Sequence, residues 1–349
     1  MKRKSFLSLI LLVITTSMLL TACGEKAPGN QSSSSASVAN GKDGNVLNVT
    51  LGGASPGGFW SLIGEGIGNI MRKSIPGSQF SYETGNGVSN TINTASGKLT
   101  MGLAHNFEIK AGLEGMEPYK EKMPKVTAIA TMYNNAAQQF IMTKEFADKY
   151  GIKGLEDIKK KKPPIKVAVN QRGNLTEAIN RISFEANGFT YKDIKKWGGE
   201  VYYEPYKPAA DMMKDNKVDL FGVPVFAPDG KILELLTSKE LVILPINEEA
   251  QKELEKELGI PAGVIPANSY EFQKEDIATS YASCIITVDP NMSEDEAYTI
   301  TKTLVENIKK IQALHKNLEV LTPEIMSDVE PAMLHPGAEK YYKEAGILK

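Results

Sequence analysis

Hydrophobic and polar positions follow a strand–loop–helix order in the first part of the chain after residue 45. The positions 47–51 alternate as in a strand, and apolar residues of 60–71 recur at the spacing of one helix face. Strands that alternate with helices are typical of βαβ units, so we expect a largely parallel sheet. The predicted strands are 47–51, 80–84 and 99–104, and the predicted helices are 60–71 and 88–96.

A second series of the same kind follows. Asn174 and Glu177 are spaced as a capping box at the start of a helix, and Ser293 and Glu296 are spaced in the same way before a long amphipathic helix that extends to 314. The predicted strands are 126–131, 139–143, 165–169, 201–203 and 218–222, with a further helix around 208–214. Two α/β series predict two α/β lobes.

The first 45 residues have a different pattern. Three basic residues at 2–4 precede an apolar run, 6–20, that is short for a membrane span and is followed by small residues, as in a secretory signal. Residues 20–23 read Leu-Thr-Ala-Cys, which resembles the bacterial lipobox. We therefore expect a lipoprotein signal peptide at 1–22, then a lipidated Cys23 and a flexible Gly- and Ser-rich tether to residue 45. An ordinary signal peptide with an incidental cysteine is the alternative.

Composition and charge exclude several classes of function. The 349 residues are 42% hydrophobic and 23% charged, as in a globular protein, and the formal net charge of −2 lacks the basic surplus that nucleic-acid binding needs. Two cysteines are too few for a disulfide scaffold or a Cys-rich zinc module, and the three histidines lack metal-ligand spacing. Cys284 stands in an apolar strand-like segment, which predicts a buried core thiol. No cofactor motif is present, and we expect none to bind.

One motif is typical of an enzyme. Residues 53–57 match the G-x-S-x-G pattern of a serine hydrolase, with Ser55 as the nucleophile. The oxyanion hole of that fold uses the backbone N–H of the residue after the serine, and Pro56 has no N–H. We therefore expect no enzyme, and a hydrolase that uses Ser55 is the weaker alternative.

The same loop is better suited to hold a ligand. Glycine-rich turns before helices leave backbone N–H groups unpaired, and 52–58 and 170–174 are two such turns that would open toward one crevice. Phe59 and Trp60 would supply an aromatic wall or pack in the core. Arg172 would contact a carboxylate or lie exposed on its loop. This pattern indicates a small anionic solute.

Several motifs stand in an order that resembles the solute-binding receptors of TRAP transporters, TAXI subfamily. They are G-x-x-x-G-G-F-W-x-x-x-G at 53–64, Gly-Asn-Gly-Val-Ser-Asn at 85–90, Ser-Gly-Lys-Leu at 96–99, Val-Asp-Leu-Phe-Gly at 218–222, Ile-Pro-Ala-Asn-Ser-Tyr at 265–270 and Leu-His-Pro-Gly-Ala at 334–338. The resemblance implies a type II periplasmic-binding-protein fold, with two α/β lobes and a ligand cleft between them. The implied boundaries are 46–133 for lobe 1, 134–278 for lobe 2 and 279–349 for the return segment of lobe 1.

The resemblance also implies a function. The protein would be anchored at the extracytoplasmic face of the membrane through lipid on Cys23. It would deliver a carboxylate such as glutamate or 2-oxoglutarate to a multi-span TRAP membrane subunit. A ligand-sensing module of a membrane signalling protein is the alternative. Closure would occur about hinge strands near 126–131 and 279–288.

Three departures from the family pattern fall at the expected cleft. Phe59 and Trp60 replace the usual two tyrosines, and His105, Asn106 and Phe107 replace a common Gln-Ser-Asp run. The loop 170–174 replaces a Gly/Pro/Ser-rich one, so a different acid is indicated. The candidate ligand-binding residues are Ser55, Gly57, Gly58, Phe59, Trp60, Asn86, Gly87, Asn90, His105, Asn106, Arg172, Gly173, Asn174 and Thr176.

Overall fold

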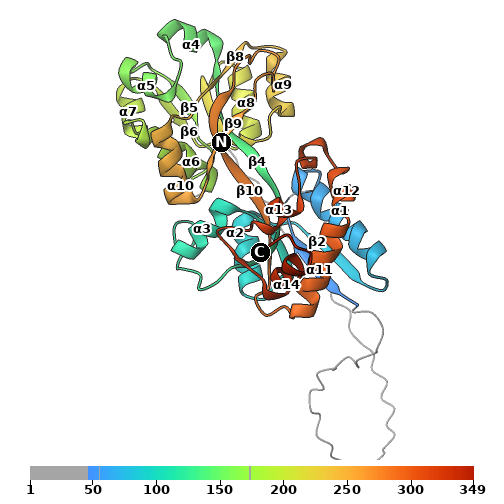
Figure 1. Cartoon of the computed structure of the whole chain (residues 1–349). Helices are drawn as coiled ribbons and strands as arrows, with labels where there is room; N and C mark the ends of the chain where they lie inside the picture. Colours follow the sequence, from blue (N-terminus) through green and yellow to red (C-terminus); the bar gives the residue numbers. More distant parts are fainter. Residues whose placement is uncertain (1–45, 55, 173) are drawn as a thin grey trace, which may run out of the picture. The chain divides into compact units, whose positions relative to one another are not determined.

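A mixed β-sheet flanked by helices organises the part of the chain that the computed structural model describes, residues 46–54, 56–172 and 174–349 (Figure 1). The predicted signal peptide, Cys23 and the tether lie outside the described residues, as do Ser55 and Gly173. The strands are β1 (Asn48–Gly52), β2 (Gln79–Glu83), β3 (Met101–His105), β4 (Thr127–Thr143), β5 (Lys166–Ala168), β6 (Glu200–Tyr202), β7 (Leu220–Val225), β8 (Leu241–Leu244), β9 (Ala262–Ile265), β10 (Ile277–Val288) and β11 (Met333–Leu334).

The helices connect these strands and cover the sheet. They are α1 (Phe59–Ser74), α2 (Gly87–Ala95), α3 (Asn106–Glu114), α4 (Lys144–Tyr150), α5 (Leu155–Lys161), α6 (Leu175–Ala186), α7 (Tyr191–Lys196), α8 (Tyr206–Lys214), α9 (Gly230–Leu236), α10 (Glu248–Leu258), α11 (Glu294–Glu306), α12 (Ile308–Gln312), α13 (Pro323–Ser327) and α14 (Pro336–Glu344), with a 3₁₀ turn, η1 (Lys316–Leu318). None of the described helices combines the length and the apolar character that a membrane span requires.

The sheet has the order β2-β1-β3-β10-β4-β7-β5-β6. The pairs of β1 with β2 and β3, and of β5 with β6 and β7, are parallel, as predicted. The prediction of a largely parallel sheet is wrong for its centre, where β10 pairs antiparallel with β3 and β4, and β4 pairs antiparallel with β7. The reason is that the chain passes from one α/β series to the other along β4 and returns along β10.

The long strand β4 merges two predicted strands. Asn134 and Asn135 interrupt the apolar pattern, but the backbone continues through them, because flanking residues Tyr133 and Ala136 pair with Cys284 and Ala282 of β10. We call the part of the fold built on β1–β3 the β3 side, and the part built on β5–β8 the β7 side. The strands β4 and β10 are common to both (Figure 1).

Local signals placed most helix starts correctly. The predicted capping box of Ser293 and Glu296 is present at α11, but the predicted long helix is interrupted at Asn307, after which α12 begins. Asn174 caps α6 through the N–H of Thr176, while Glu177 accepts a hydrogen bond from Tyr191 at 2.7 Å, so the second predicted box is absent. The described α/β architecture agrees with the predicted fold class.

Candidate functional site

A cavity of about 690 Å³ lies where β3 and β7 end and where the first residues of several helices meet. Ligand sites of open α/β sheets occur at the carboxyl ends of strands, and this volume lies within the range of small-molecule sites. Eight of the candidate residues line it: Gly58, Phe59, Trp60, Asn86, Gly87, His105, Asn174 and Thr176.

The N-termini of five helices lie at this cavity. The N-cap residues that line it are Gly58 of α1, Asn86 of α2, His105 of α3, Asn174 of α6 and Asp229 of α9. Asn86 and Asn174 satisfy a backbone N–H of their own helices. Gly58 has no side chain to do so, and α1 has no acidic residue in its first turn. Among the described residues no side chain caps the N-terminus of α1, so its N–H groups and its positive helix end are suited to a ligand.

Side chains from neighbouring elements hold Gly53 and Ala54, which directly follow β1. The hydroxyl of Tyr82 accepts from the N–H of Ala54 at 2.7 Å and donates to its carbonyl at 2.9 Å. Asn90 donates from Nδ2 to the carbonyls of Gly53 and Leu103, at 2.9 and 2.8 Å. A Cβ at Gly53 would come within 2.1 Å of the Tyr82 hydroxyl, so this close approach requires glycine.

An aromatic cluster forms one wall of the cavity. Phe59, Tyr133 and Phe226 contact one another edge to face, with ring centroids 4.9–5.8 Å apart, and His315 lies 5.1 Å from Phe59. Such edge-to-face contacts add to the energy of area burial. Trp60 is buried and also lines the cavity, so it packs in the core and contributes to the wall. The cluster joins α1, β4 and the loop after β7.

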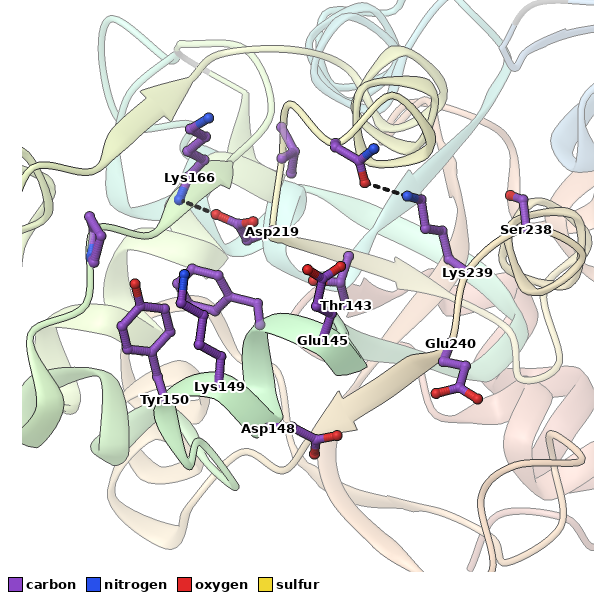
Figure 2. Close-up of a pocket in the computed structure, with 14 residues that line it drawn as sticks. Thr143, Glu145, Asp148, Lys149, Tyr150, Lys166, Asp219, Ser238, Lys239 and Glu240 are labelled. Carbon is purple, nitrogen blue, oxygen red and sulfur yellow. Dashed lines mark hydrogen bonds between the residues drawn. The ribbon is translucent and has the colours of Figure 1, made fainter.

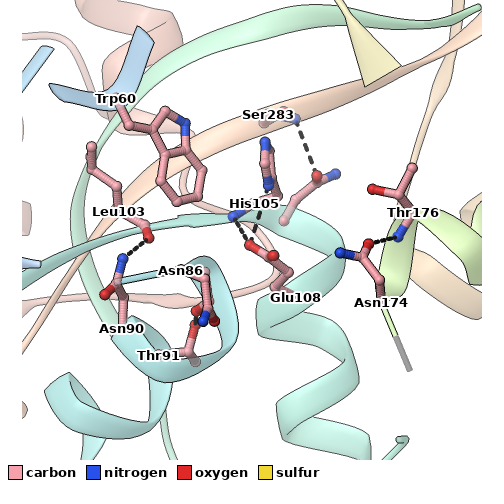
Figure 3. Close-up of polar contacts among 12 residues, drawn as sticks. Trp60, Asn86, Asn90, Thr91, Leu103, His105, Glu108, Asn174, Thr176 and Ser283 are labelled. Atoms are coloured by element: carbon pink, nitrogen blue, oxygen red, sulfur yellow. Dashed lines mark hydrogen bonds and ion pairs between the residues drawn. The ribbon is translucent and has the colours of Figure 1, made fainter. Parts of the chain in front are cut away.

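A chain of polar contacts continues behind this wall. The indole Nε1–H of Trp60 donates to the hydroxyl of Tyr133 at 2.9 Å, and that hydroxyl lies 3.4 Å from Nε2 of His105. Oε2 of Glu108 accepts the backbone N–H of His105 at 2.8 Å and lies 3.2 Å from its Nδ1 (Figure 3). The imidazole stacks on Phe107 with centroids 4.8 Å apart. Burial raises the pKa of Tyr133 well above its ordinary value, so its hydroxyl stays neutral.

A second network positions the wall of the β7 side. The Tyr270 hydroxyl accepts the backbone N–H of Asp229 at 3.0 Å and donates to Oε1 of Gln139 at 2.8 Å. Nε2 of Gln139 donates in turn to the carbonyls of Val225 and Phe226. Gln139 lies on β4, so the common strand holds the loop that carries Phe226 and Asp229. Fully satisfied buried networks of this kind hold a site in one geometry.

The sequence pattern of the NMT1-like family matches residues 51–346. The chain belongs to that family. The NMT1-like protein is also similar to solved structures. The periplasmic binding protein BugD has 14% identity and a TM-score of 0.50, with 86% of this chain and 97% of that chain covered. MatC (Rpa3494) from Rhodopseudomonas palustris with bound malate has 14% identity and a TM-score of 0.50, with 87% and 100% covered.

These likenesses show the two-lobe fold of periplasmic solute-binding proteins, as the sequence predicted. The fold is that of the binding proteins BugD and MatC. The positions of the lobe boundaries stay a prediction.

Four of the candidate residues described in the structure do not line the cavity at the ends of β3 and β7. Asn90 holds the glycine-rich loop from the core side, and Gly57 is exposed. Asn106 is buried, with its amide bonded to the carbonyl of Gly259 and the N–H of Ser283. The guanidinium of Arg172 lies 3.8 Å above the ring of Tyr203, where it makes a cation–π contact. Ser55 and Gly173 lie outside the described residues.

Several residues that line the cavity are not among the candidates predicted from the sequence. They are Glu108, Tyr133, Phe226, Asp229, His315 and Lys316, among others. Asp229 could have been found, because it precedes Gly230 at a helix start and resembles an N-cap signal. Tyr133 and Phe226 carry no local signal, since strand pairing brings them to the cavity.

A second cavity of about 690 Å³ lies in the part of the fold built on β5–β8, at the amino ends of β5 and β7 (Figure 2). Charged side chains of both signs line it, and the carboxylate of Asp219 accepts the backbone N–H of Lys166 at 2.8 Å. Burial raises the pKa of Asp219. This second cavity has one helix N-terminus, that of α4 at Thr143, and one aromatic pair, Phe146 and Tyr150, where the first cavity has five helix N-termini and an aromatic cluster. No group of three potential metal ligands occurs among the residues described.

Proposed function

We propose that this protein is an extracytoplasmic solute receptor that captures a small carboxylate-bearing solute in the cavity and delivers it to a TRAP-type secondary transporter. The observation that carries the proposal is the convergence of helix N-termini on one cavity, where no described side chain caps the N-terminus of α1 at Gly58. Backbone N–H groups and the positive helix end at this point suit a carboxylate. The TRAP-type partner follows from the sequence resemblance described above.

A thermal-shift screen across organic acids and amino acids tests the proposal. A solute at one hundred times its Kd should stabilise the folded state by about 2.7 kcal/mol. For a body of about 300 residues this corresponds to an increase of roughly 4 °C in the melting temperature. The proposal is wrong if no acid or amino acid in the screen changes the transition.

Substitution at Gly58 tests the place of binding. Its backbone is extended, at φ −89° and ψ 173°, so another residue can adopt it. Gly58→Asp would cap the N–H groups of α1 with its own carboxylate and repel a bound one, so we expect at least tenfold weaker solute binding without loss of stability. Gly58→Asn is the control of the same size without the charge, and the difference between the two variants measures the charge effect. Equal affinities of both variants and the parent would place the carboxylate elsewhere.

The membrane anchor and the partner have separate tests. We propose lipid attachment at Cys23, so Cys23→Ser should move the protein from the membrane fraction to the soluble fraction and abolish labelling with a fatty-acid analogue. Affinity capture from membranes should recover a multi-span protein. Recovery of a signalling kinase with few spans would favour the sensing alternative.

A further inference from the structure

We propose that the solute is amphoteric and ring-bearing: it carries a protonated amine beside its carboxylate and an apolar ring. This inference rests on the proposed function, because it names the solute class of the same cavity. Three features of the cavity carry it: two carboxylates with one oxygen each left for a ligand, an aromatic wall, and the balance of charge.

The two carboxylates are those of Glu108 on α3 and of Asp229 at the N-cap of α9, and both residues line the cavity. Glu108 uses Oε2 for the backbone N–H and Nδ1 of His105. Asp229 uses Oδ1 for the N–H groups of Lys231 and Ile232 and for the hydroxyl of Tyr206. Within the described residues, Oε1 of Glu108 and Oδ2 of Asp229 receive no hydrogen bond. Each carboxylate therefore uses one oxygen to accept backbone N–H groups at the start of its helix. The other oxygen can accept a hydrogen bond from a cationic N–H group of the solute.

The aromatic wall supplies the complement to an apolar ring. Phe59, Trp60, Tyr133 and Phe226 all line the cavity, and the first, third and fourth of them form a packed cluster. Aromatic rings pack favourably on one another, and their faces also attract a cation. A small dicarboxylate has no apolar surface to place against such a wall. A ring-bearing solute gains from it by burial of apolar area.

The charge of the cavity disfavours a second acid group on the solute. The described lining residues include two carboxylates and one ammonium group, that of Lys316, whose side chain is exposed. A dicarboxylate that places one acid at the N-terminus of α1 would bring the other toward Glu108 or Asp229, where like charges repel. An amine at that position has the opposite sign. An α-amino acid with an aromatic side chain combines the three groups.

The test is isothermal titration with L-phenylalanine, with two analogues that each lack one of its groups, and with a dicarboxylate. L-Phenylalanine has the ring, the amine and the acid; 3-phenylpropanoate lacks the amine; 2-phenylethylamine lacks the acid; and 2-oxoglutarate has two acids and no ring. We expect phenylalanine to bind at least tenfold more tightly than each of the others. Tighter binding of 2-oxoglutarate would overturn the inference.

Two substitutions assign the amine to its acceptors. Glu108→Gln and Asp229→Asn should each weaken phenylalanine binding at least tenfold while leaving 3-phenylpropanoate unchanged or bound more tightly. The matched controls are Glu114→Gln on the same helix as Glu108, and Asp215→Asn, both exposed away from the cavity and paired with surface lysines. Thermal denaturation of each variant checks the fold, and either variant alone suffices.

The outcomes separate this inference from the proposed function. If both substitutions leave the preference for phenylalanine over 3-phenylpropanoate intact, the carboxylates do not hold an amine and the inference is wrong. If an acid without an amine binds and none of the ring-bearing probes does, the inference is wrong while the proposed function stands. If no probe and no acid in the thermal-shift screen binds, both are wrong.

Discussion

Substitution of Tyr133 by phenylalanine tests the polar chain behind the aromatic wall. The Tyr133 hydroxyl accepts the indole N–H of Trp60 at 2.9 Å, and the two residues are 4% and 8% exposed. Tyr133→Phe leaves this buried N–H without its acceptor, which costs about 1–3 kcal/mol. An unfolding entropy of about 2.1 cal/mol/K per residue over roughly 300 residues converts this cost to a decrease of about 2–5 °C in Tm.

The chain offers a matched control. Tyr119 is 5% exposed, and its hydroxyl is buried with no hydrogen-bond partner within the described residues. Tyr119→Phe removes the same atom from a similar environment, but no donor is left unpaired. We therefore expect its free energy of unfolding to change by less than about 0.5 kcal/mol. Urea denaturation of the two variants and the parent, monitored by circular dichroism, supplies the comparison.

A double-mutant cycle isolates the hydrogen bond itself. Trp60→Phe removes the donor, so Tyr133→Phe in that background should cost less than about 0.5 kcal/mol. Equal losses from Tyr133→Phe and Tyr119→Phe would refute the reasoning. So would an undiminished cost of Tyr133→Phe in the Trp60→Phe background, because the hydroxyl would then act through another contact.

Three further predictions follow from burial and placement. Arg172→Ala should change solute affinity less than twofold in titration calorimetry, because its guanidinium stacks on Tyr203 and not in the cavity; a loss above tenfold would contradict this. Burial raises the pKa of Cys284 well above its ordinary value, so the folded protein should resist thiol reagents that label the urea-unfolded chain, and rapid labelling without urea would be the contrary result. Burial lowers the pKa of His335, whose Nδ1 accepts the N–H of Gly337. The unfolded state therefore binds more protons than the folded state when the pH is below about 6.5. As the pH decreases through this range, the free energy of unfolding should decrease by up to about 1.4 kcal/mol per pH unit. His335→Asn should flatten this dependence in urea titrations at pH 7.5 and 5.5, and an equal fall in the variant would speak against it.

Local signals in the sequence located the parts of the site that depend on neighbouring residues. A glycine or asparagine before an apolar helical run marks a helix start, and Gly58, Asn86 and Asn174 all proved to be N-caps at the cavity. The short alternating segments likewise gave strands where predicted. These features need only the residues a few positions away, so one sequence suffices for them.

Long-range packing determines which of the other candidate side chains reach the cavity, and no local sequence pattern predicts that packing. Asn90 and Asn106 were expected to contact the solute, but buried carbonyl groups of Gly53, Leu103 and Gly259 take their amides. Arg172 was expected to face the cavity, but its guanidinium makes a cation–π contact with the ring of Tyr203, the residue after β6. Which partner a polar side chain finds depends on strands that meet only after folding.

The two strands common to both sides also determine the order in which the chain can fold. A hydrogen bond from the hydroxyl of Thr287 on β10 to the carbonyl of Gly102 on β3 closes a loop of 185 residues. The β3 side is therefore complete only when β10, which follows the whole of the β7 side in the sequence, has joined it. Contacts between residues so far apart in the sequence slow folding, because the chain loses the entropy of closing the loop before the contact stabilises it. We therefore expect the β7 side to fold first, and the cavity to form only when β10 joins the sheet.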